Sequence, residues 1–158
     1  MPDDLYWDDT LLWSEQQAAR LRRLAAGERV NDVDWEHVIE EIEDVGKAEL
    51  RACTSLLRKA IEHLLKVQGW PGHPASEHWR NEIVVFLADA EGAFTPSMRQ
   101  NIDLASYYRR ALRDVRAMTT DGSGPSALPE SCPFALDDLL ADDLDLNGLL
   151  AKLPPAAG

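Results

Sequence analysis

The sequence predicts an all-α protein: a helical bundle of four to five main helices, followed by a short helical and acidic C-terminal tail. Three observations lead to this class. Apolar residues recur at every third or fourth position through most of the chain, which is the period of a helix with one buried face. No segment alternates apolar and polar residues as a sheet strand does. With 158 residues, 45% of them apolar, the chain has the size of a single domain, expected to span residues 1–158.

The first helix is expected over about residues 10–26. Asp8 or Asp9 supplies a side-chain oxygen that accepts hydrogen bonds from the free amides at a helix start. Gly27 supplies the left-handed residue that commonly follows a helix.

A longer helical element is expected from a cap at Asp34 to about Val67. Its first apolar positions step by three or four and form one face that we expect to pack inward: Trp35, Val38, Ile39, Ile42 and Val45. Gly46 is the obvious helix breaker, so either one helix kinked at that glycine or two helices with a tight joint fit the pattern. The continuous element is favoured.

Two more helices follow the proline-containing loop GWPGHP. One is expected from a cap at Ser76 to near Gly92. The other is expected to start at Pro96, where a missing amide proton costs least, and to run to about Met118.

The remainder of the chain divides into two segments. Residues 119–133 contain three prolines and read as a linker-like loop. Residues 134–158 mix leucines with acids and are expected to form an acidic tail with short helices.

The formal charge is −12, with a net −9 over residues 1–45 and a net +3 over residues 46–116. A negative field disfavours general binding to nucleic acid or to anionic lipid. No apolar run is long enough to cross a membrane, and the start of the chain lacks the basic residues of a signal peptide, so we expect a cytoplasmic protein. Cys53 and Cys132 stand far apart, which predicts two reduced thiols, and no cofactor is expected.

Four short sequences occur in the order EEIEDVG, HLLK, HWR and SCPFALDDLL. In this order the chain resembles an uncharacterised bacterial family catalogued as domain of unknown function number 29, over nearly its whole length. The resemblance implies an α-helical bacterial protein with no assigned biochemical function. Members of that family often carry an aromatic residue after HLLK, where this chain has Val67.

The carboxylates near the start of the long helix raise the question of a metal site. His37 with Glu40 or Glu41 has the spacing that places two ligands over one turn. Di-iron bundles, however, use Glu-x-x-His pairs on two facing helices, and this sequence has no second pair. We therefore favour a solvated acidic face and no metal.

Two residues are candidates for catalysis. Glu41 lies beside the apolar face and needs a partner if it reaches the interior, and His63 lies among leucines. A histidine can act as acid or base near neutral pH, but a core histidine satisfied by a backbone carbonyl or a carboxylate is the more common case. Trp79 and Arg80 are candidates for ligand binding, against the alternative of a packed corner of the bundle.

Arginines and tyrosines occur together in YYRRALRDVR. Arg109, Arg113 and Arg116 share one side of a helix, and Arg110 lies on another. Such residues can bind nucleic acid, but pairing with the acids of the chain is favoured at this net charge.

No nucleotide-binding, hydrolase, zinc-protease or kinase motif is present. The sequence therefore favours a non-catalytic helical module that binds a protein partner or forms a homo-oligomer. An enzyme or metal-dependent protein with a His/Glu site is the alternative, and nucleic-acid binding through the arginines is the weaker alternative. No membrane partner is expected.

Overall fold

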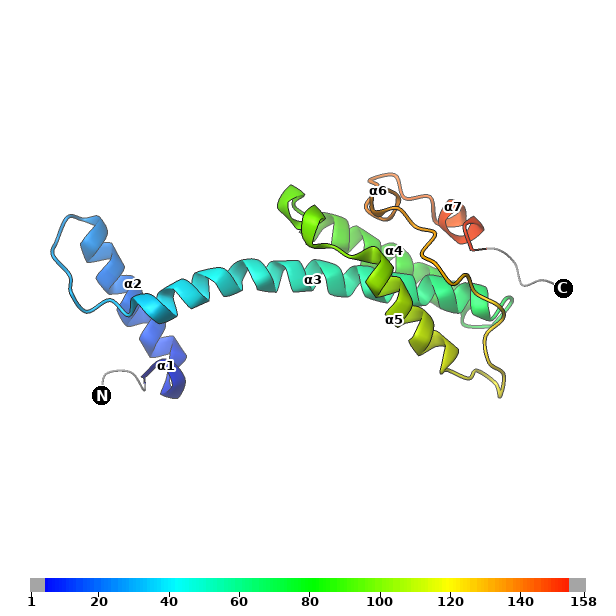
Figure 1. Cartoon of the computed structure of the whole chain (residues 1–158), viewed down its shortest axis with the longest axis horizontal. Helices are drawn as coiled ribbons and strands as arrows, with labels where there is room; N and C mark the ends of the chain where they lie inside the picture. Colours follow the sequence, from blue (N-terminus) through cyan, green and yellow to red (C-terminus); the bar gives the residue numbers. More distant parts are fainter. Residues whose placement is uncertain (1–4, 154–158) are drawn as a thin grey trace. The chain divides into compact units, whose positions relative to one another are not determined.

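The computed structural model describes residues 5–153, and all the regular elements in that range are helical (Figure 1). This confirms the all-α prediction. The chain divides into two compact units, Met1–Ala48 and Glu49–Gly158, called here the N-terminal and C-terminal units. None of the described helices is both long enough and apolar enough to cross a membrane.

The N-terminal unit consists of α1 (Leu5–Asp8), α2 (Thr10–Ala25) and the first part of α3. Asp9 is one of the two residues expected to cap this helix. It caps α2 by accepting a 3.0 Å hydrogen bond from the Leu12 amide. Gly27 follows α2 with a φ of 88°, a conformation that glycine adopts without strain. The single turn of α1 was not predicted.

Helix α3 runs without interruption from Trp35 to Gly69 (Figure 1). Asp34 precedes it, and the Val38 amide donates to the Asp34 carbonyl at 3.0 Å. Gly46 therefore lies inside one helix and does not divide it, as favoured from the sequence.

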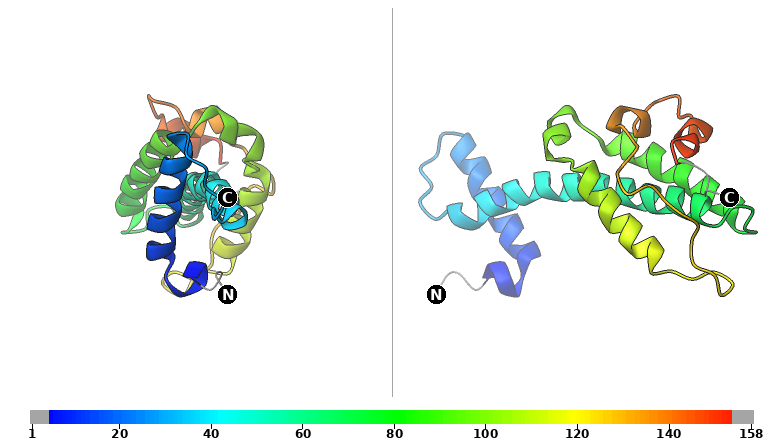
Figure 2. Two further views of the ribbon diagram at one scale, coloured as in Figure 1. Left: turned by 90° about the vertical axis from the view of Figure 1, so that its left-hand side faces the viewer. Right: turned by 45° about the vertical axis from the view of Figure 1, so that its right-hand side comes forward.

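The C-terminal unit packs α4 (Ser76–Ala93) and α5 (Leu104–Arg116) against the second part of α3 (Figure 2). Ala75 occupies the N-cap position of α4 with no side-chain hydrogen bond, so Ser76 begins the helix but does not cap it.

The helix expected over residues 96–118 is two elements in the structure, a 3₁₀ helix η1 (Pro96–Asn101) and α5. Asp103 accepts a 3.1 Å hydrogen bond from the Ser106 amide and so starts a new helix. A local side-chain acceptor thus interrupts the helix, although the apolar period that suggested one helix continues across the break.

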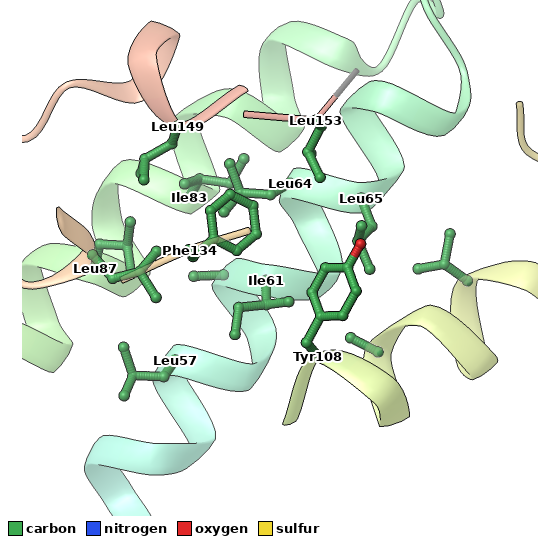
Figure 3. Close-up of a cluster of buried hydrophobic side chains, with 14 of the residues drawn as sticks. Leu57, Ile61, Leu64, Leu65, Ile83, Leu87, Tyr108, Phe134, Leu149 and Leu153 are labelled. Carbon is green, nitrogen blue, oxygen red and sulfur yellow. The ribbon is translucent and has the colours of Figure 1, made fainter. Parts of the chain in front are cut away.

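The core of the C-terminal unit is one apolar cluster contributed by α3, α4, α5 and the tail (Figure 3). In the close-up, side chains from these segments point toward one another: Leu57, Ile61, Leu64, Leu65, Ile83, Leu87, Tyr108, Phe134, Leu149 and Leu153. Cys53 is buried in the same cluster.

The segment after α5 is held against the rest of the C-terminal unit. The Ser126 amide donates to the Gly69 carbonyl at 2.7 Å, and the Tyr108 hydroxyl donates to the Pro129 carbonyl at 2.6 Å. Leu128 is buried in the core. Residues 119–133 have the composition of a linker, but in the structure they form a segment with defined contacts to the rest of the unit.

The acidic tail forms two short helices, α6 (Leu136–Leu139) and α7 (Leu146–Ala151). Its leucines Leu139, Leu149 and Leu153 are buried in the core of the C-terminal unit. The helical tail is confirmed, while its last expected residues, 154–158, lie outside the described residues.

Candidate functional site

A group of polar and aromatic side chains joins the helices of the N-terminal unit. We call Tyr6, Trp13, Asp34, His37 and Glu41 the N-terminal cluster. Asp34 Oδ2 accepts from Trp13 Nε1 at 2.9 Å and lies 2.7 Å from His37 Nδ1. The Tyr6 hydroxyl donates to Glu41 Oε1 at 2.7 Å, and the Tyr6 ring stacks on His37 with 3.9 Å between ring centroids. These contacts fasten α1 and α2 to the start of α3.

Buried Gln17 completes this arrangement, because its Oε1 accepts from the Asp34 amide at 2.8 Å. Asp34 therefore contacts both α2 and α3 through its backbone and its side chain. The contacts of Asp34 with Trp13 and Gln17 therefore hold the loop before α3 against α2.

The hydrogen bonds of the cluster shift the ionisation of its members. Burial acts to raise the pKa of Asp34, but hydrogen bonds from His37 and Trp13 outweigh it and hold that pKa below its ordinary value. The hydrogen bond to Asp34 raises the pKa of His37. The hydrogen bond to Glu41 raises the pKa of Tyr6 to about 12. Near neutral pH, Tyr6 is therefore a hydrogen-bond donor and not a base.

The pairing of Asp34 with His37 resembles the carboxylate–imidazole pair that orients a general base. The two hydroxyl groups on the first turns of α2 bond to backbone carbonyls: Thr10 donates to the Tyr6 carbonyl and Ser14 to the Leu11 carbonyl, each at 2.8 Å. The contacts of the cluster join α1, α2 and the start of α3.

The candidate metal ligands His37, Glu40 and Glu41 do not converge. His37 is bonded to Asp34, Glu41 accepts from Tyr6, and Glu40 is exposed. Within residues 5–153, no group of three or more His, Cys, Asp or Glu residues is arranged to hold a metal ion.

The catalytic candidates Glu41 and His63 lie 22 residues apart on the same helix and belong to different compact units. Glu41 belongs to the N-terminal cluster, whereas His63 has partners of its own in the C-terminal unit.

His63 contacts oxygen atoms through both ring nitrogens. Its Nδ1 lies 2.8 Å from the Lys59 carbonyl and its Nε2 lies 2.6 Å from Glu82 Oε2. His78 Nε2 lies 3.3 Å from the other oxygen of Glu82. Both ring nitrogens of His63 therefore have oxygen partners within the C-terminal unit.

Trp79 and Arg80 are adjacent in α4 but have different environments. Trp79 is buried in the core and stacks on His73, with 4.9 Å between ring centroids. Arg80 donates to Asn147 Oδ1 at 2.5 Å and so ties α4 to the tail. The Trp70 indole donates to the Ser123 carbonyl at 3.0 Å. This end of the C-terminal unit is a packed corner.

The arginine-rich helix α5 is partly neutralised by acids of its own unit. Arg113 pairs with Asp114 at 3.1 Å, and Arg116 pairs with Glu130. The hydrogen bond from Arg116 holds the pKa of the Glu130 carboxyl below its ordinary value. Arg109 and Arg110 are exposed.

The most distinctive surface of the N-terminal unit is apolar. Trp35, Ile39, Ile42 and Val45 are 52%, 52%, 68% and 65% exposed, and we call these four residues the α3 stripe. The expectation that this whole face packs inward is wrong, since only Val38 of that set is buried. His37 and Glu41, on either side of Val38 in the sequence, are partly buried, and Glu41 accepts a hydrogen bond from Tyr6 of α1.

A pocket of about 430 Å³ lies next to the first residue of the stripe. Its walls include Trp13, Gln17, Asp34 and Trp35. A 3.0 Å ion pair between Arg20 and Asp32 forms part of its lining. The pocket and the α3 stripe therefore share Trp35.

Sequence reasoning missed Tyr6, Trp13 and Glu82 as partners of the candidate residues. No pattern marks them, because each contact joins residues far apart in sequence: Tyr6 and Glu41 are 35 positions apart. The α3 stripe was visible as a pattern, but its exposure was not.

A family model for the domain of unknown function DUF29 matches residues 5–144. Among solved structures, the crystal structure of an α-helical protein of unknown function from Rhodospirillum rubrum, at 1.45 Å resolution, is similar to this chain. The two are 33% identical with a TM-score of 0.72, and the match covers 95% of this chain and 98% of the other. No curated protein matches the sequence. The extent of the family match shows that the chain belongs to the DUF29 family.

Proposed function

We propose that this protein is a non-catalytic interaction module whose N-terminal unit binds a helical segment of another protein through the α3 stripe. The observation that carries the proposal is the exposure of four large apolar side chains on consecutive turns of one helix. Scattered exposed apolar residues are ordinary, whereas a continuous row on one helix is typical of a binding surface.

The location of the stripe supports this function. Its residues recur at spacings of four, three and three, which is the pattern that a second helix contacts. In the described part of the C-terminal unit, by comparison, the large apolar side chains that are exposed belong to two adjacent residues of α4, Val84 and Val85. Adjacent residues on a helix point about 100° apart and do not make a row.

The state of the histidines argues against the alternative of an enzyme. His63 has both ring nitrogens engaged, and His37 is held by Asp34 and covered by the ring of Tyr6. A metal-dependent role for this His/Glu site predicts stoichiometric metal in protein purified without a tag. We expect elemental analysis to find none, and stoichiometric metal would restore that alternative.

Nucleic-acid binding through α5 remains the weaker alternative. Arg113 and Arg116 already have acidic partners, which reduces the positive charge available to phosphates. We expect the protein to pass through a heparin column at low salt. Retention that falls steeply with salt would favour this alternative.

The proposal is tested by placing a photo-crosslinking amino acid at Ile42, with Val84 as the matched exposed position on α4. In cells of the source organism we expect a discrete protein adduct at position 42 and none at position 84. The adduct is identified by mass spectrometry, and the purified partner is then titrated against the wild type. The double variant Ile39→Ser/Ile42→Ser should lose binding, while Val84→Ser/Val85→Ser should keep it. A partner that binds all three proteins equally would contradict the proposal.

Self-association through the stripe is measured separately, by light scattering over a wide range of protein concentration. A homo-oligomer that dissociates in the Ile39→Ser/Ile42→Ser variant would identify the partner as a second copy. A wild type that stays monomeric leaves a different protein as the partner.

A further inference from the structure

We infer that the segment bound at the α3 stripe is a cationic amphipathic helix belonging to another protein. This inference rests on the proposed function and adds the chemistry of the partner. It is drawn from the charges beside the stripe.

A row of carboxylates runs parallel to the stripe. Glu36, Glu40 and Glu43 each follow a stripe residue by one position, so each lies about 100° around α3 from Trp35, Ile39 and Ile42. All three side chains are exposed. We call these three glutamates the acid row.

Within the described residues no lysine or arginine pairs with the acid row, while Glu36 and Glu40 interact electrostatically with His37 and help to raise its pKa. Among the ion pairs formed by the described residues, none includes Glu36, Glu40 or Glu43. The nearest lysine in the sequence, Lys47, lies 3.8 Å from Asp44. An apolar row bordered by acids is complementary to a helix with an apolar row bordered by lysines or arginines.

The shape of the surface favours a helix as the occupant. The stripe extends over ten residue steps of α3, about 15 Å at the helical rise, which matches three turns of a partner. Near its end, Gly46 has no atoms within 4 Å of the position that a Cβ would occupy. A backbone can therefore approach α3 more closely there than at the other residues of the same turn.

A second copy of this chain is the less suitable occupant. Pairing two stripes would bring two acid rows together, and residues 34–46 contain acids but no lysine or arginine to relieve the repulsion. The net charge of −12 adds to that repulsion at longer range.

The test uses the full chain and three fluorescein-labelled model peptides, each about 14 residues long so that a helix can form on binding. The first contains leucine at helical spacing with lysine on the other positions. The second has glutamate in place of lysine, and the third has the composition of the first in an order without helical amphipathicity. We expect fluorescence anisotropy to show binding of the first peptide and little or none of the other two.

Variants of the protein separate local recognition from general attraction to an acidic chain. We expect Ile39→Ser/Ile42→Ser to weaken binding of the cationic peptide at least ~10-fold, because two buried isoleucines are lost from the interface. Glu36→Gln/Glu40→Gln/Glu43→Gln should weaken it by roughly 10-fold at low salt and less at high salt. The control Glu91→Gln/Asp142→Asn/Asp143→Asn removes the same charge from exposed positions of the C-terminal unit and should leave binding within about 2-fold.

Three results overturn the inference: no binding of the cationic amphipathic peptide, equal binding of the glutamate peptide, or equal weakening by the two charge-removing variants. These failures are distinct from failure of the proposed function. A crosslinked partner that depends on the stripe but presents a neutral or acidic helix, or a second copy, retains the proposed function and rejects the cationic partner.

Discussion

The two units of this protein use α3 in different ways. The C-terminal unit surrounds its part of the helix with one large apolar cluster that includes Leu57, Ile61 and Leu64. The N-terminal unit buries only Trp13 and Val38 among the apolar residues described in it, and it joins its helices through the polar and aromatic contacts of the N-terminal cluster. Hydrophobic burial therefore stabilises the C-terminal unit much more than the N-terminal one.

The comparison shows that spacing alone does not decide burial. Ile39 and Ile42 precede Cys53 and Leu57 in a series with the same helical steps, yet the first two are exposed and the last two are fully buried. The difference lies in the neighbours, because α4 and α5 cover the later residues. The exposed apolar side chains of the stripe are the observation on which the proposed binding rests.

The largest expected effect is in the C-terminal core. Leu64 is fully buried, so Leu64→Ala should lower the free energy of unfolding by about 2–5 kcal/mol. Ile42→Ala, on the exposed stripe of the same helix, should change it by less than about 0.5 kcal/mol. Urea unfolding followed by circular dichroism checks both. Similar costs for the two variants would mean that Ile42 is buried in solution.

Two glycines of α3 give a sharper comparison. A Cβ at Gly69 would lie 2.8 Å from Pro125 Cβ, so Gly69→Ala should destabilise the protein by about 1–3 kcal/mol. A Cβ at Gly46 meets no atom within 4 Å, so Gly46→Ala should stabilise α3 by about 0.5–1 kcal/mol through its better helix propensity. Both values come from the same urea unfolding measurement. A destabilising Gly46→Ala would show that this glycine has a packing role.

The N-terminal cluster is tested by Trp13→Phe. This change removes the indole donor to Asp34 but keeps an aromatic ring, and it should cost about 1 kcal/mol in the N-terminal unit. Hydrogen exchange of the α2 amides should accelerate, while the amides of α4 keep their protection. Equal acceleration in α4 would indicate that the two units unfold together.

The stability of the N-terminal unit should depend on pH through the pair of His37 and Asp34. Since the pKa of His37 is raised above 6.5 in the folded state, its interaction with Asp34 stabilises the N-terminal unit fully below pH 6.5 and is lost as the pH rises through the raised value. The lowered pKa of Asp34 adds stability that is present above pH 3.8 and is lost as the pH falls through the lowered value. Protection of the α2 amides, corrected for intrinsic exchange, should therefore decrease above pH 6.5, and Asp34→Asn should flatten the profile. A wild-type profile that stays flat above pH 6.5 would contradict the charged pairing.

The chain's local patterns predicted much of the fold. Apolar period and the absence of strand-like alternation predicted the all-α class, and the candidate caps Asp8 or Asp9 included the residue that caps α2. The break between η1 and α5 was missed, because the apolar period continues across it while Asp103 restarts the helix. The candidate residues Glu41 and His63 were recognised as needing partners, but Tyr6 and Glu82 could not be named from the sequence.

The sequence by itself determined where helices form, because helix propensity, capping and apolar spacing act over a few neighbouring residues. It also determined that acids border the apolar row of residues 35–45, since that follows from helical geometry. Only the tertiary structure decided which part of that long apolar face is covered and which is exposed. Coverage depends on contacts between residues distant in the chain, such as Trp13 with Asp34 and Tyr108 with Pro129, and no local pattern specifies those partners.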